Sequence, residues 1–112
     1  MSARRLTLFA CFVLLGCYPK AAPPPKALAP TQLQLAQQRS ADISTEALER
    51  GRVSFVGKCG ECHDHPDLSA VRLSKWPSIL EEMDEKAELV EPAKGELNAF
   101  VLSAAEAAKA PR

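Results

Sequence analysis

Large apolar side chains are scarce in this chain, and that scarcity limits what it can fold into. The 112 residues include one Trp, one Tyr and four Phe. Two of the Phe, Phe9 and Phe12, lie in an N-terminal apolar run. A chain of this length forms one small domain at most. A domain with so little apolar surface to bury is marginal by itself and usually needs a disulfide, a metal or a cofactor.

The N-terminal 17 residues, MSARRLTLFACFVLLGC, have the pattern of an export signal. Arg4 and Arg5 precede an apolar stretch over 6–15, which is shorter than the roughly 20 residues of a membrane span. The last four letters, LLGC, resemble the bacterial lipobox. The resemblance implies that residues 1–16 are a lipoprotein signal peptide and that the Cys17 thiol receives a diacylglycerol. An ordinary secretory signal with an incidental Cys is the alternative, and both export the chain.

Residues 17–43 form the expected tether between the lipidated Cys17 and the domain. Five of the nine prolines lie between 19 and 30, so an extended polyproline II conformation is favoured. Leu33 and Leu35 alone suggest a short helix. In a Gram-negative source, Tyr18 in place of the usual inner-membrane retention Asp implies an outer-membrane lipoprotein with its domain in the periplasm.

The remaining residues, 44–112, are expected to form an all-α domain with three main helices. Ser44 or Thr45 is a suitable N-cap for an amphipathic helix over 45–58. A second helix carries Trp76, Ile79, Leu80 and Met83 on one face and tolerates Pro77 in its first turn. A third is expected to start at Pro92. No segment alternates as a strand would.

Residues 59–63 read Cys-Gly-Glu-Cys-His, the C-x-x-C-H signature of covalent haem attachment. Two thiols separated by two residues of a helical turn can each add to one haem vinyl group. The His that follows then stands beneath the ring centre and can bind iron through Nε2. In the mature chain Cys59 and Cys62 are the thiols that remain besides Cys17.

Three other interpretations of this string compete with haem. A redox or structural C-x-x-C expects a βαβ context, which this sequence does not suggest. Zinc could use Cys59, Cys62 and either His63 or His65, but a structural zinc site needs four ligands. The string could also be an accident in an exported protein.

A six-coordinate iron needs a second axial ligand. His65 lies two residues after His63 and is therefore on the same side of the ring. Met83 is the remaining candidate, because Met1 leaves with the signal. A thioether opposite His raises the reduction potential. The alternative is that Met83 only fills space between helices.

Several positions together resemble the small monohaem cytochromes c, in particular a bacterial subset with a W-x-x-x-L-x-x-M segment after the haem motif. The resemblance covers residues 45–105. The positions that carry it are Gly51, Phe55, Cys59, Cys62, His63, Pro66, Trp76, Pro77, Leu80, Met83, Glu96, Leu97, Phe100, Val101 and Leu102.

The resemblance implies one covalent haem c held by thioethers to Cys59 and Cys62, with His63 and Met83 as axial ligands. It implies that Pro66 fixes the proximal loop, by a carbonyl near His63 Nδ1, and that Trp76 either reaches a haem propionate or packs. Phe55 and Phe100 correspond to the aromatic contact where two helices cross.

The expected function is single-electron transfer between redox protein partners at a membrane, without catalysis. The alternatives are a haem-based sensor of small ligands with an open sixth position and a haem-free metal-binding lipoprotein. With 14 basic and 14 acidic residues, the chain lacks the basic excess typical of nucleic-acid binding. The acidic residues between 81 and 91 are either a docking face for a basic partner or a solvated helix face.

Overall fold

The computed structural model describes residues 20–109, which fold into four α-helices and one 3-10 turn. The elements are α1 (Gln32–Gln37), α2 (Thr45–Lys58), η1 (Leu73–Lys75), α3 (Trp76–Lys86) and α4 (Ala93–Lys109). Within this range the only β pairing is an isolated antiparallel bridge between Ala21 and Pro66. The all-α prediction is therefore confirmed. The expected signal peptide and the expected lipidation site, Cys17, lie outside the described residues.

Helix α2 has the bounds that its sequence predicts. The Ser44 hydroxyl accepts a hydrogen bond from Ala47 N at 3.1 Å and so satisfies one of the unpaired amides of the first turn. Glu46 in the first turn and Lys58 in the last complement the helix dipole. The N-terminus of α2 is fixed in this way. The helix then determines the position of its C-terminal end, which leads into the Cys59 motif.

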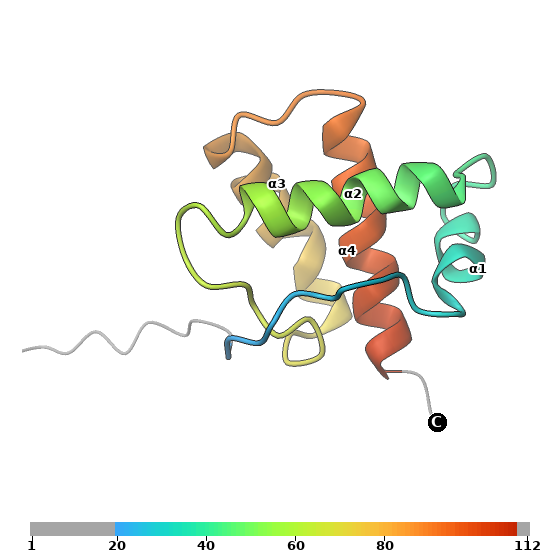
Figure 1. The fold of residues 1–112 in the computed structure, drawn as a ribbon, viewed down its shortest axis with the longest axis horizontal. Helices are drawn as coiled ribbons and strands as arrows, with labels where there is room; N and C mark the ends of the chain where they lie inside the picture. Colours follow the sequence, from blue (N-terminus) through green and yellow to red (C-terminus); the bar gives the residue numbers. More distant parts are fainter. Residues whose placement is uncertain (1–19, 110–112) are drawn as a thin grey trace, which may run out of the picture.

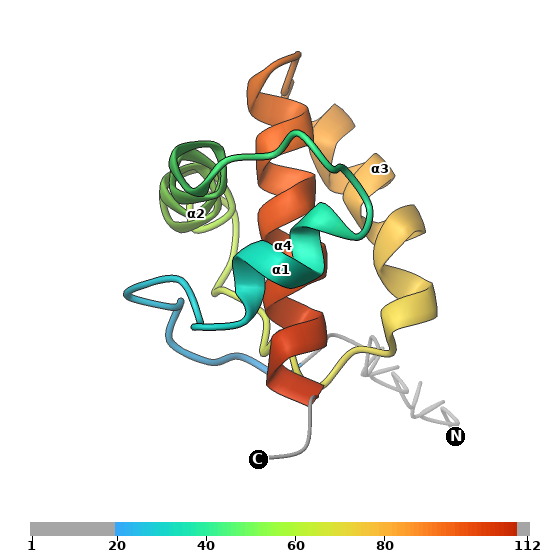
Figure 2. The ribbon, with the colours of Figure 1, turned by 90° about the vertical axis from the view of Figure 1, so that its right-hand side faces the viewer.

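Helix α4 is the central element, and α2 and α1 cross it (Figures 1 and 2). The closest approach is at Gly51, where a Cβ would stand 2.1 Å from the Glu96 carbonyl oxygen and 2.9 Å from Phe100 Cβ. One turn further along α2, the Phe55 and Phe100 rings meet with centroids 5.6 Å apart and planes at 45°. This is the helix-crossing aromatic contact that the sequence predicts. The core continues with Leu97, Val101 and Ala105 of α4.

Helix α3 packs through Trp76, Leu80 and Asp84, which are all buried. They follow one another at four-residue intervals and so form one stripe. Pro77 occupies the first turn as expected. The helix ends in a Schellman motif in which Leu89 N donates to Asp84 O at 2.9 Å and Glu88 has a φ of 56°.

The structure differs from the sequence-based expectation at residues 20–43, which pack against the helices. Gln32 is 1% exposed, and its amide donates to Phe100 O at 3.2 Å and to Ser103 Oγ at 3.1 Å. Ala36 of the same helix is also buried. The predicted boundary at Ser44 is therefore not a break in the packing. A polar contact with α4, rather than a hydrophobic stripe, holds α1 in place.

Replacing Gln32 with alanine is expected to lower the free energy of unfolding by about 1–3 kcal/mol, because the Phe100 carbonyl loses a buried partner. The matched control is Gln34→Ala, which changes an exposed glutamine of the same helix and should cost under about 0.5 kcal/mol. Urea unfolding followed by circular dichroism measures both. Equal, small effects would indicate that residues 20–43 act as a tether.

Candidate functional site

The Cys59 motif begins where α2 ends. Cys59 is the C-cap residue, and its amide donates to Phe55 O at 3.3 Å. Its side chain is half-buried against the hydrophobic core. Cys62 is exposed, and the two thiols are not joined as a disulfide. The turn thus gives the two thiols different surroundings, one at the core and one at the surface.

The pKa of the Cys59 thiol is raised to about 11, mainly by burial and to a smaller extent by the nearby charges of Asp84 and Cys62. A redox-active C-x-x-C depends on a cysteine whose pKa is lowered, so that a nucleophilic thiolate forms near neutral pH. The shift at Cys59 has the opposite sign. The arrangement therefore favours a neutral Cys59 thiol, which is the less reactive form for thiol–disulfide exchange.

His63 is oriented by its own loop. Its Nδ1 lies 2.8 Å from the Asp64 carbonyl oxygen. A carbonyl can only accept, so Nδ1 carries the proton and, in the neutral ring, the lone pair is on Nε2. Metal-binding histidines commonly have this tautomer, fixed by a backbone carbonyl. The sequence analysis expected the Pro66 carbonyl to accept this hydrogen bond from His63 Nδ1. In the structure the Asp64 carbonyl accepts it instead.

Pro66 has a different contact. It forms the antiparallel bridge with Ala21, and its neighbours make the hydrogen bonds of that pairing. Ala22 N donates to His65 O at 3.0 Å, and Asp67 N donates to Lys20 O at 2.6 Å. Pro66 thus helps to fix the loop after His63 through the N-terminal segment.

His65 closes the end of α2, a role that sequence reasoning missed. Its Nε2 lies 2.9 Å from Val56 O, so an Nε2–H satisfies a carbonyl that the last helical turn leaves unpaired. The same Nε2 lies 3.1 Å from Phe55 O, which also accepts from Cys59 N. Gly60 makes room for this ring, since a Cβ there would stand 2.7 Å from His65 Cε1. Gly60, the glycine inside the C-x-x-C-H motif, was the sequence signal that could have indicated this close approach of His65. Together the two residues turn the chain sharply after Cys59.

Trp76 and Asp84 are buried polar residues of α3 whose side-chain atoms lack partners. Trp76 is 2% exposed, and its indole Nε1 has no hydrogen-bond partner among the described residues. The same is true of both carboxylate oxygens of Asp84, also 2% exposed. Burial raises the pKa of the Asp84 carboxyl, although the nearby Asn98 and Lys94 oppose the shift. Such groups are uncommon in folded proteins, so each of them calls for a specific explanation.

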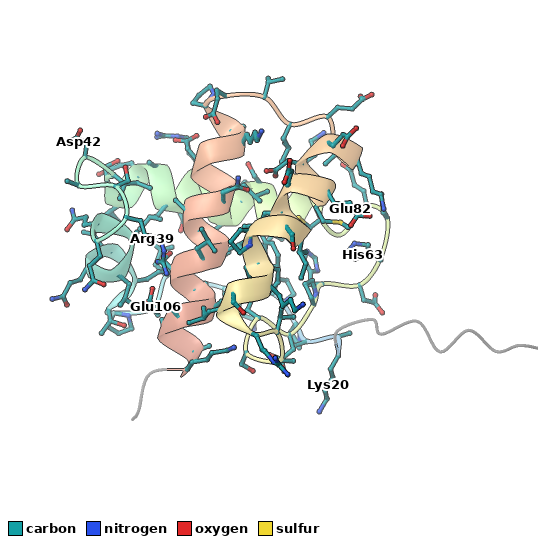
Figure 3. The ribbon with its side chains drawn as sticks, turned by 180° about the vertical axis from the view of Figure 1, so that it is seen from behind. Lys20, Arg39, Asp42, His63, Glu82 and Glu106 are labelled. Carbon is teal, nitrogen blue, oxygen red and sulfur yellow. The ribbon has the colours of Figure 1, made fainter. Side chains whose placement is uncertain are left out.

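Met83 lies half-buried beside this stripe, next to Asp84. The charge on Asp84 acts on the Cys59 thiol and that on Cys62 acts on Lys86, so the last turns of α3 lie near the motif. Figure 3 shows His63 and Glu82 in the same part of the molecule. The sequence placed Asp84 with the exposed acidic residues, and the structure corrects this, because Asp84 continues the inner stripe.

In residues 20–109 no three His, Cys, Asp or Glu side chains gather as a metal site would require. None of the helices described is long and apolar enough to cross a bilayer. The chain matches no known family model, no curated protein and no solved structure.

Proposed function

We propose that this protein is a single-electron carrier that holds one haem c. Cys59 and Cys62 form the thioethers, and His63 and Met83 are the axial ligands. The observation that carries the proposal is the C-x-x-C-H string in the turn after α2, with His63 Nδ1 hydrogen-bonded to Asp64 O at 2.8 Å. That bond leaves Nε2 as the nitrogen that can bind iron.

The other donors suit the same group. The unpartnered indole N–H of Trp76 is a buried donor that a haem propionate can accept from. The half-buried thiol of Cys59 borders an apolar core that includes Phe55 and Leu80, against which a porphyrin edge can pack. The chain thus supplies two thiols, an oriented imidazole, a thioether and a spare donor.

Haem c supplies, when bound, an iron that cycles between the ferric and ferrous states. The residues of this chain determine how it is held. His63 and Met83 would both bind the iron and leave no place for a substrate, so the proposed role is carriage rather than catalysis. The thioether of Met83 is uncharged and favours the reduced state more than a second imidazole does.

The proposed location is the periplasmic side of a membrane, with the outer membrane favoured. It rests on the signal-like residues 1–16 and on Cys17, which resembles a lipidation site. The partners are then a redox donor and acceptor that reach the same membrane surface. Residues of α3 offer one contact face for a basic partner, because Glu81, Glu82 and Glu85 are exposed.

The test is to produce the full chain with a c-type maturation system and compare it with Met83→Leu, which removes the sulfur at similar volume. A haem-stained band on a denaturing gel and a weak far-red absorption of the oxidised protein are expected for the unchanged chain. The band should persist in Met83→Leu and the absorption should disappear, with the potential falling.

The matched control is Ile79→Leu, one turn earlier on the same edge of α3, which should keep the absorption. A stained band without the far-red absorption in the unchanged chain would exclude Met83 as a ligand and favour the sensor of small ligands. An unchanged spectrum in Met83→Leu would also exclude Met83 as a ligand. The absence of a stained band in the unchanged chain would refute the cytochrome proposal.

A further inference from the structure

The first described residues are fastened to the loop that follows His63. Residues 20–22, called the strap below, pair antiparallel with residues 65–67 through the hydrogen bonds Ala22 N to His65 O and Asp67 N to Lys20 O. Further along, Arg52 of α2 donates to Pro25 O at 3.3 Å, and Ala29 N donates to the side chain of Gln32. The segment is therefore held at several points before α1 begins.

These hydrogen bonds shorten the free chain between a lipid anchor at Cys17 and the folded domain. Three residue steps separate Cys17 from Lys20. A fully extended chain covers about 3.5 Å per step, so the lipid attachment point lies within about 10 Å of the strap. A tether that ran free to residue 43 would allow the domain many orientations and a long reach. The packed strap allows neither.

The surface around the strap is basic. Lys20, Arg72, Lys75 and Lys109 are all exposed, and we call these four residues the strap face. Lys109 Nζ donates to Val71 O, which brings the end of α4 to the same loop as Arg72. Two carboxylates, Asp64 and Asp67, lie in the same loop, and that of Asp67 accepts hydrogen bonds from Ser69.

The densest run of acidic residues lies at the other end of the molecule. Residues 81–91 contain six carboxylates and one lysine. The turn between α3 and α4 lies on the opposite side from the strap and from the C-terminal end of α4 (Figure 1). Asp42 also lies far from Lys20 (Figure 3). The four cations of the strap face thus lie at the end where an anchor enters, beside Asp64 and Asp67 and away from the carboxylates of residues 81–91.

We propose that the strap face rests on anionic phospholipid headgroups, so that the domain lies on the membrane with the His63 loop near its surface. The proposal rests on the lipid anchor of the proposed function. A Lys or Arg close to an anionic membrane strengthens binding about fivefold. A rigid entry point within about 10 Å of the lipid then brings all four cations to the headgroups together.

The experiment uses the full lipidated chain in vesicles of phosphatidylcholine with phosphatidylglycerol and a nickel-chelating lipid. A ketone-bearing amino acid is encoded at position 70, beside the strap face, or at position 42, opposite it, and carries a spin label. Both positions are exposed. Collisional relaxation by the surface nickel is expected to be several times stronger at position 70, and to even out in high salt as the charges are screened. Equal relaxation, or stronger relaxation at position 42, overturns the proposal.

The charge contribution is tested with Arg72→Gln, Lys75→Gln and Lys109→Gln combined. The matched control, Arg39→Gln, Arg50→Gln and Lys86→Gln, removes the same charge from other faces. The first variant should lose most of the difference between the two labels, and the control should keep it. A full difference in the first variant refutes the role of the cations.

Failure of the anchor is distinguished from failure of the orientation by the mass of the N-terminal peptide. A Cys17 without lipid overturns the proposal at that step. Haem staining reports the electron-carrier function independently, because the labels do not use the cysteines. The comparison of the two labels in the unsubstituted chain stands even if a charge variant fails to fold.

Discussion

Replacing Cys59 and Cys62 together with alanine is expected to abolish covalent haem attachment and to leave a chain without a cooperative thermal transition. The described core contains only Phe55, Trp76 and Phe100 as aromatic residues. Small domains with so little apolar surface rarely fold without a staple. In the proposed holoprotein the porphyrin supplies the missing surface. Haem staining and differential scanning calorimetry measure the two losses.

The matched control for this pair is Glu61→Ala, which changes an exposed residue between the two thiols. It should keep both the stain and the transition. A stained band in the double alanine variant would contradict the assignment of the thioethers. A sharp transition in the same variant would show that the helices pack without haem.

Exchanging Gly51 for alanine is expected to destabilise the proposed haem-loaded protein by about 3 kcal/mol. The new Cβ would stand 2.1 Å from the Glu96 carbonyl oxygen and 2.7 Å from its carbon. These are backbone atoms, so α2 and α4 must move apart. The contact between Phe55 and Phe100 is then weakened. Urea unfolding followed at the Soret band measures the change.

The same exchange at Gly57 provides the comparison, because nothing lies within 4 Å of a Cβ placed there. Both glycines are within α2, so alanine gains the same helix propensity at each. Gly57→Ala should therefore stabilise by about 0.5–1 kcal/mol. Loss of stability in both variants by similar amounts would contradict the close crossing at Gly51.

Local sequence signals predicted the parts of the fold that depend on neighbouring residues. The Ser44 cap and the apolar spacing predicted α2 from Thr45 to Lys58. Pro77 and Trp76 predicted the start of α3. The contact between Phe55 and Phe100, which only the family resemblance implied, is observed with ring centroids 5.6 Å apart.

Contacts between distant residues could not be predicted in the same way. Gln32 bonds to residues 68 and 71 positions away, and nothing in its own segment indicates a buried amide. Its neighbourhood is rich in proline and polar residues, which is typical of a linker. The packing of residues 20–43 therefore depends on partners that only the folded chain brings together.

Asp84 was misplaced for a different reason. It lies four residues after Leu80 and eight after Trp76, so the helical period already placed it on the inner face. The run of acidic neighbours suggested a solvated surface instead. For His65 the sequence suggested no structural role, and the structure gives it contacts with Phe55 O and Val56 O at the end of α2. A histidine close to a functional motif can thus have a structural role.

The strap also determines where mechanical load enters the domain. Tension applied from the N-terminal side of the chain meets the hydrogen bonds of Lys20 and Ala22 to Asp67 and His65 before it reaches any helix. These bonds lie two to four residues from His63. A pull strong enough to peel the strap would therefore disturb the His63 loop first and leave the crossing of α2 and α4 intact.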